Sequence, residues 1–168
     1  DREQRIEALL KIAETYIKQK EYLPAVNAFN KILTDQEPDK DLKVDVTFRM
    51  AEIYTQIKEY DKARKAYADI LEMTGINENV KVEAQRKIAD TYLKQKEYSS
   101  AVDALMAIRN MKEATPIDCV SVQFRLGDTY RLSGDKESAK LAYKKVLSMP
   151  ATTFEDKFEA NKKIGDMY

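Results

Sequence analysis

The chain has 168 residues, 43% of them hydrophobic and 35% charged, a length and composition typical of one folded domain that can bury a core. Its 29 basic and 29 acidic side chains leave no net charge to attract nucleic acid or an anionic membrane, and no apolar run is long enough for a membrane span. Histidine is absent and there is one cysteine, which removes the commonest general base and any Cys/His metal cluster, so we expect no enzyme, metal or cofactor.

A four-residue motif recurs along the chain: a small residue, an acidic residue, any residue and a tyrosine. Its tyrosines are spaced by 38 residues: Tyr16, Tyr54, Tyr92, Tyr130 and Tyr168. A fixed period of this size is typical of stacked repeats, each of which buries a face only against its neighbours. The period predicts a single repeat domain over residues 1–168, made of repeats 1–38, 39–76, 77–114 and 115–152 and a half repeat at 153–168.

Each repeat is predicted to begin with a long helix, called helix A below. A residue suited to the helix N-cap starts every repeat: Asp1, Asp39, Asn77, Thr115 and Thr153. At Thr115 the signal is reinforced by Pro116 and by Asp118 in capping-box position, and Thr153 is followed by Glu155 and Asp156. The A helices are expected to end near residues 18–20, 57–58, 94–96 and 132–133, with a fifth over residues 153–168.

A second helix, helix B, is predicted to begin at Tyr22, Tyr60, Tyr98 and Lys136. Its apolar residues follow helical spacing, as in Ala25-Ala28-Phe29-Ile32, and both alanine columns are unchanged in every repeat. Small residues at fixed places allow helices A and B to approach closely. Glu37-Pro38, Gly75 and Pro150 mark the ends of B helices.

The ten tyrosines of the chain fall on three columns. Those of the motif and those on helix B, Tyr67 and Tyr143, are expected to pack in the core, because a stacking contact must recur in every repeat. The column at the turn is expected to be half exposed: Tyr22, Tyr60 and Tyr98.

These columns resemble the tetratricopeptide repeat family. The pattern of that family is carried in the first repeat by Ala13 and Tyr16 on helix A and by Ala25 and Phe29 on helix B. The resemblance covers the whole chain and implies an all-α fold, an α-solenoid of antiparallel helix pairs in a right-handed superhelix of about four and a half repeats. It also implies a scaffold that binds a peptide or protein segment in a concave groove lined by the A helices.

The chain departs from the family in two ways. Its period is 38 residues, not about 34, and the early tryptophan column holds Leu9, Thr47, Gln85, Gln123 and Asn161. Four extra residues add about one helical turn, which the N-cap column places at the start of helix A. We therefore expect long A helices within the same fold.

One stripe of helix A is charged in every repeat. It contains a basic column (Lys11, Arg49, Lys87, Arg125, Lys163) and an acidic column (Glu14, Glu52, Asp90, Asp128, Asp166). These groups can pair along one helix or with a neighbouring helix A. Two interpretations stay open: a structural salt-bridge ladder, or a groove surface that selects the charge of a ligand. The acidic column stands where carboxylate-clamp members of the family carry asparagine, which disfavours a ligand carboxylate and favours basic or mixed charge.

A variable column runs beside the charged stripe: Leu10, Phe48, Arg86, Phe124 and Lys162, continued by Ile17, Thr55, Leu93 and Arg131. Variation within a repetitive frame is what a binding surface would show, with Phe48 and Phe124 as apolar anchors, although these rings could instead pack against the adjacent helix B. The candidate groove residues are Phe48, Arg49, Glu52, Arg86, Asp90, Phe124, Asp128 and Arg131.

An alternative function is a structural spacer or self-assembly module within a larger multi-repeat protein. The sequence does not start with Met, which suggests a piece of a longer protein, and the last helix A has no helix B after it. Phe158, Ile164 and Tyr168 are therefore expected to lack cover, and such ends could stack end to end. Nothing in the sequence predicts the compartment.

Overall fold

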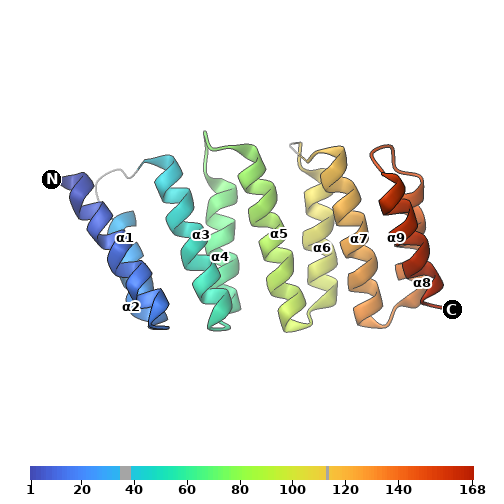
Figure 1. Cartoon of the computed structure of the whole chain (residues 1–168), viewed down its shortest axis with the longest axis horizontal. Helices are drawn as coiled ribbons and strands as arrows, with labels where there is room; N and C mark the ends of the chain where they lie inside the picture. The colour runs from blue at the N-terminus through green and yellow to red at the C-terminus, as the bar shows by residue number, and fades with distance from the viewer. Residues whose placement is uncertain (35–38, 113) are drawn as a thin grey trace. The chain divides into compact units, whose positions relative to one another are not determined.

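The computed structural model describes residues 1–34, 39–112 and 114–168, and over these residues it contains nine α-helices and no strand. It divides into two compact halves, Asp1–Asn77 and Glu78–Tyr168. Figure 1 shows the order of the helices. They are α1 (Arg2–Lys18), α2 (Tyr22–Leu33), α3 (Lys40–Gln56), α4 (Tyr60–Glu72), α5 (Glu78–Gln95), α6 (Tyr98–Asn110), α7 (Pro116–Ser133), α8 (Lys136–Leu147) and α9 (Phe154–Gly165).

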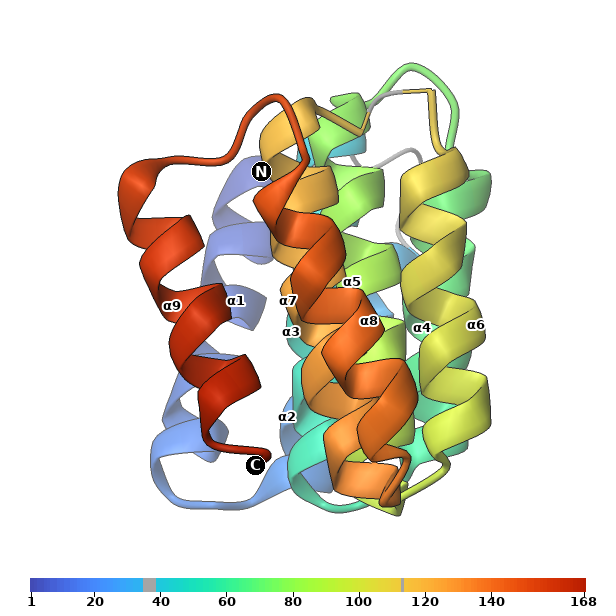
Figure 2. The ribbon, with the colours of Figure 1, turned by 90° about the vertical axis from the view of Figure 1, so that its right-hand side faces the viewer.

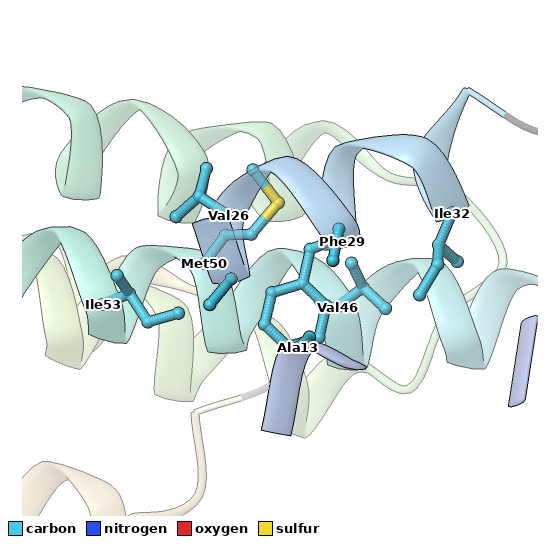
Figure 3. Close-up of a cluster of buried hydrophobic side chains, with 9 residues drawn as sticks. Ala13, Val26, Phe29, Ile32, Val46, Met50 and Ile53 are labelled. Atoms are coloured by element: carbon cyan, nitrogen blue, oxygen red, sulfur yellow. The ribbon is translucent and has the colours of Figure 1, made fainter. Parts of the chain in front are cut away.

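The N-terminal half contains two antiparallel pairs, α1 with α2 and α3 with α4. Its A helices have 17 residues each and its B helices 12 and 13, so the prediction of long A helices is confirmed. Phe29 of α2 is fully buried between the two A helices, against Ala13 of α1 and Val46 and Met50 of α3 (Figure 3). A helix B thus packs against its own helix A and the next one, which is how a repeat buries its apolar face.

The C-terminal half contains the pairs α5–α6 and α7–α8, followed by α9. Leu105 and Ile108 of α6 pack against Val122 and Leu126 of α7, as Phe29 packs against α3 in the other half. Tyr143 and Val146 of α8 pack in turn against Ala160 of α9. The last helix ends at Gly165, three residues before the predicted end at Tyr168.

The predicted N-caps are confirmed at three of the five helix starts. Thr115 and Thr153 each form a capping box, in which the threonine hydroxyl accepts from the backbone N–H of Asp118 or Asp156 at 3.1 Å. Asp1 accepts the N–H of Glu3. Helix α3 begins at Lys40, directly after Asp39, as predicted. Within the described residues, however, the Asp39 side chain makes no capping hydrogen bond, so the prediction that it caps the helix was wrong. The predicted break at Glu37-Pro38 lies outside the described residues.

All four B helices begin at the residues expected from the sequence, and their Ala–Ala–large–aliphatic stripes are buried. The turn before each B helix contains a residue in the left-handed region: Lys20 (φ 61°), Lys58 (φ 64°), Lys96 (φ 62°) and Gly134 (φ 88°). The N–H of the following residue donates to the carbonyl of the motif tyrosine, as from Asp135 to Tyr130 at 2.9 Å. These bonds are those of a Schellman C-cap, so three lysines occupy a position that glycine normally takes.

The tyrosine columns largely match their predicted environments. Tyr67 and Tyr143 are buried, and the turn column at Tyr22, Tyr60 and Tyr98 is partly exposed. The motif tyrosines of the four complete repeats are partly buried against the core clusters. Tyr168 differs, because 89% of its surface is exposed.

Candidate interaction surface

The acidic and basic columns of neighbouring A helices are joined by ion pairs. In the N-terminal half, Arg49 Nη1 of α3 donates to Glu14 Oε1 of α1 at 3.1 Å. In the C-terminal half, Arg125 of α7 pairs with Asp90 of α5. Lys163 Nζ of α9 donates to Asp128 Oδ1 of α7 at 2.9 Å. These pairs confirm that the basic column reaches the acidic column of a neighbouring helix A.

Arg49 and Arg125 are partly buried, and burial and neighbouring charges shift the pKa of each guanidinium group. Burial acts to lower the pKa of Arg49, but its hydrogen bonds to Glu14 and to Asp45 outweigh burial and raise it. For Arg125, burial lowers the pKa and the positive charge of Arg86 acts in the same direction. Both guanidinium groups stay charged at neutral pH, since an arginine pKa lies far above it. Each half therefore carries fixed charge pairs between its own A helices.

Asp128 collects three groups around one carboxylate oxygen. The hydroxyl of Tyr143 donates to its Oδ1 at 2.7 Å, Lys163 Nζ lies at 2.9 Å and Arg131 Nη2 at 4.0 Å. Burial raises the pKa of Tyr143, and the hydrogen bond to Asp128 adds to the shift, so the phenol stays protonated and donates. Sequence reasoning missed this link between helices A and B. The recurrence of its spacing at Glu52 and Tyr67 was the available signal.

Arg86 connects α5 to the start of α7. Its guanidinium pairs with Glu83 on its own helix and with Asp118 Oδ1 at 3.0 Å. Burial acts to raise the pKa of Asp118, but the hydrogen bonds from Thr115 and the charge of Arg86 lower it below its ordinary value. One carboxylate therefore caps α7 and also holds Arg86 in place.

Phe48 and Phe124 occupy the same column of α3 and α7, and each contacts a buried tyrosine of helix B. The ring of Phe48 meets Tyr67 edge to face, with centroids 5.6 Å apart, and Phe124 lies 6.4 Å from Tyr143. Both phenylalanines stay partly exposed. The interpretation that they pack against helix B is supported, and each ring still presents a surface to solvent.

The eight candidate residues thus lie in two groups. Phe48, Arg49 and Glu52 lie on α3 of the N-terminal half, where Glu52 is exposed. The other five lie on α5 and α7 of the C-terminal half: Arg86, Asp90, Phe124, Asp128 and Arg131. Ion pairs link the two helices of this second group, which places its charged and aromatic side chains on one connected surface.

A column of amides joins helices A and B, a role that the sequence did not reveal. Gln85 Nε2 donates to the carbonyl of Ala104 and Gln123 Nε2 to that of Ala142, both at 3.1 Å. These glutamines stand where the family pattern has its early tryptophan. At the same position of α3, the shorter Thr47 lines a hollow of about 610 Å³ together with Met50 and Ala66.

Within residues 1–34, 39–112 and 114–168, no three Asp, Glu or Cys side chains converge as metal ligands would. Within the same residues, none of the helices is both long enough and apolar enough to cross a bilayer.

Sequence comparison decides the family. Models described as tetratricopeptide repeat match residues 7–36, 45–73 and 120–153, together more than half of the chain. The chain belongs to the tetratricopeptide repeat family. Repeats of this family are generally non-enzymatic scaffolds, and for this chain the family supports a general role as a protein-interaction scaffold. No curated protein matches the sequence.

Solved structures support the fold class. The chain is 19% identical to MamA with a TM-score of 0.60, covering 94% of this chain and 82% of that one. A tetratricopeptide repeat protein from Parabacteroides merdae is 14% identical with a TM-score of 0.64, covering 98% and 60%. The repeats of a putative kinesin light chain from Podosopora anserina are 13% identical with a TM-score of 0.65, covering 100% and 87%. At such identities the likeness establishes an all-α solenoid of helix pairs and nothing about partners.

Proposed function

We propose that the chain binds an extended peptide or protein segment of basic or mixed charge along the exposed face of its A helices. The observation that carries this proposal is the surface of α5 and α7, where a partly exposed aromatic ring, Phe124, lies among charged groups held by ion pairs. Charges fixed before binding cost little entropy when a ligand arrives, and a ring seated on a buried tyrosine is a rigid anchor.

The acidic column determines which ligands fit. Asp90 pairs with Arg125, and Asp128 pairs with Lys163 at 2.9 Å and with Arg131 at 4.0 Å. A ligand carboxylate at this face would meet these acidic groups and lose Coulomb energy. A ligand with lysine or arginine could share Asp128 with Arg131. The proposal therefore excludes recognition of a C-terminal carboxylate.

The test begins with a displayed library of random peptides selected on the full chain. A variant with Phe48→Ala, Arg86→Ala and Phe124→Ala together is expected to lose binding of the selected peptides by about tenfold or more, as loss of anchor residues does. The matched control is Lys65→Ala, Asp103→Ala and Leu141→Ala, which changes three exposed residues of one helix-B column.

Circular dichroism must show equal helicity for the two variants, because Phe48 and Phe124 also touch the core. Selected peptides are expected to carry basic residues, and amidation of their C-terminus should leave the affinity unchanged. Equal binding to both triple variants would show that the A-helix face is not the site. A requirement for a free C-terminal carboxylate would contradict the charge argument.

A further inference from the structure

One column of helix A, which lies against helix B, changes in side-chain size from repeat to repeat. It holds Leu9 in the first repeat, Thr47 in the second, Gln85 in the third and Gln123 in the fourth. Leu9 packs against the core cluster of its half, and Gln123 is only 4% exposed. Threonine is the shortest of these side chains, so the second repeat places fewer atoms between its two helices than the other three.

The amide of this column also satisfies a carbonyl of helix B. In the fourth repeat Gln123 Nε2 donates to the carbonyl of Ala142 at 3.1 Å, across α7 and α8, which lie side by side (Figure 2). The third repeat has the same bond. In the second repeat the matching helix-B residue is Ala66, but the Thr47 hydroxyl donates at 2.7 Å to the carbonyl of Lys43 on its own helix. In the described part of the chain, no side chain donates to the Ala66 carbonyl.

The second repeat has a hollow at this place. Its volume is about 610 Å³, which falls within the range of small-molecule sites. Thr47 and Met50 of α3 line it together with Ala66 of α4 and Ile76, and none of these four is more than 9% exposed. Its lining residues all belong to the N-terminal half. The hollow therefore reaches from the surface into the contact between helices A and B, and its inner wall is apolar apart from Thr47 and the backbone.

The mouth of the hollow carries charges of both signs. Lys40 and Lys43 come from α3, Asp69 and Glu72 from α4, and all four side chains are exposed. Two cations and two anions leave the mouth without net charge, so it does not attract an ion of either sign from a distance. Burial of a charged ligand would also cost solvation energy that the apolar inner wall does not return. A neutral ligand fits this site best.

We propose that the hollow binds a neutral small molecule made of an apolar ring and a carboxamide. The ring lies against Met50 and Ile76, and the amide N–H donates to the Ala66 carbonyl, as glutamine does in the third and fourth repeats. The ligand thus supplies both the volume and the hydrogen bond that Thr47 does not provide. The site contains none of the candidate groove residues, so it does not depend on peptide binding at the A-helix face.

A small molecule fits the hollow better than a partner protein does. Protein–protein interfaces are depleted of charged residues at their centre. The mouth of this hollow is lined by four exposed charged side chains, which a docked helix or strand would have to remove from water. A ligand small enough to pass between them leaves these side chains hydrated.

The probe is β-naphthylacetamide, titrated into the full chain while backbone amide NMR spectra are recorded. A dissociation constant of about 1 mM or tighter is expected from the affinity that drug-sized ligands gain per atom. The amide signals of Thr47, Ala66 and Ile76 should shift and saturate. The N,N-dimethyl derivative keeps the ring but has no N–H to donate, so it should bind about threefold more weakly or worse.

Two substitutions place in the hollow a side chain that the same column carries elsewhere. Thr47→Gln, as in the third and fourth repeats, and Thr47→Leu, as in the first, should each weaken binding about fivefold or more, because the new side chain covers the Ala66 carbonyl. Both should also raise the midpoint of thermal unfolding, since they fill empty space. Asp41→Gln, at an exposed position of α3 outside the hollow, is the matched control and should leave binding unchanged.

Three outcomes would overturn the proposal. One is the absence of saturable shifts up to about 10 mM probe, tenfold above the expected dissociation constant. Another is equal binding to the Thr47→Gln and Thr47→Leu chains, which would place the probe elsewhere. The third is equal binding of the dimethyl derivative, which would exclude the hydrogen bond to Ala66. If circular dichroism shows that one variant has lost helicity, the other decides the site, and the two ligands test the amide on the unchanged chain.

Discussion

The second and fourth repeats have the same helix positions but different residues at the contact between helices A and B. In α3 the small residue is Ala51 and in α7 it is Gly127, while both B helices present a tyrosine, Tyr67 or Tyr143. The loss of one methyl group lets the Tyr143 ring lie on the backbone of α7, where its hydroxyl reaches Asp128. In the fourth repeat the ring position therefore depends on the absence of a Cβ at Gly127.

The two repeats also differ at both ends of helix A. Thr115 closes a capping box at the start of α7, whereas the side chain of Asp39 makes no capping bond in the described residues. After the helix, Gly134 fills the left-handed position that Lys58 fills with some strain. The fourth repeat thus has both a side-chain N-cap and a glycine at the left-handed C-cap position, and the second repeat has neither. The second forms the same helices, which shows that packing against neighbours can replace a cap or a glycine.

The largest expected effect comes from Gly127→Ala. The added methyl group cannot coexist with Tyr143 in its present position, so the change should lower the free energy of unfolding by about 1–3 kcal/mol, despite the better helix propensity of alanine. The measurement is urea unfolding followed by circular dichroism. The reverse change in the second repeat, Ala51→Gly, should cost only about 0.5–1 kcal/mol.

A double variant separates overpacking from other causes. The third repeat combines Ala89 with Leu105, so Gly127→Ala with Tyr143→Leu reproduces a pair that the chain already tolerates. The penalty of Gly127→Ala should shrink in the Tyr143→Leu background. An unchanged penalty would mean that contact with the ring is not its cause.

The next effect concerns the left-handed turn. Gly134→Ala should destabilise the chain by about 1–2 kcal/mol through backbone strain alone, because the added Cβ meets no atom within 4 Å. Lys58→Gly should have the opposite sign and stabilise by up to about 1 kcal/mol, since the native φ of 64° suits glycine. Thermal unfolding of both variants measures the contrast. Two shifts of the same sign would show that the lysine is not strained.

The smallest effect is at the helix start. Thr115→Ala removes a cap and should cost about 1 kcal/mol, whereas Asp39→Ala should change stability much less because it loses no capping bond. The loss should also depend on pH. The lowered pKa of Asp118 contributes stability that is present above the ordinary aspartate pKa and disappears as pH falls through the lowered value. Unfolding measured from neutral to acid pH should show a weaker acid dependence in Thr115→Ala. An equal dependence would mean that the cap does not set the pKa of Asp118.

Much of the fold could be predicted because the same residue types recur every 38 residues along the chain. The B helices start where the period placed them, and the Ala–Ala–large columns are buried in all four repeats. The pairing between Arg49 and Glu14 was accessible in the same way, since their columns recur on neighbouring helices. The assignment of the candidate residues to a ligand groove stays a prediction, because a charged pair looks the same in a sequence whether it serves packing or recognition.

The sequence by itself determined the period, the two helices of each repeat, the capping boxes and the family, because these depend on local chemistry and on fixed spacing. Only the tertiary structure decided that Tyr143 lies on Gly127 and donates to Asp128, that Lys58 takes a left-handed conformation, and that Ile164 is covered while Phe158 is not. These features depend on how two helix faces approach each other in space. A column shows that a contact recurs, but only packing shows which side of the helix makes it.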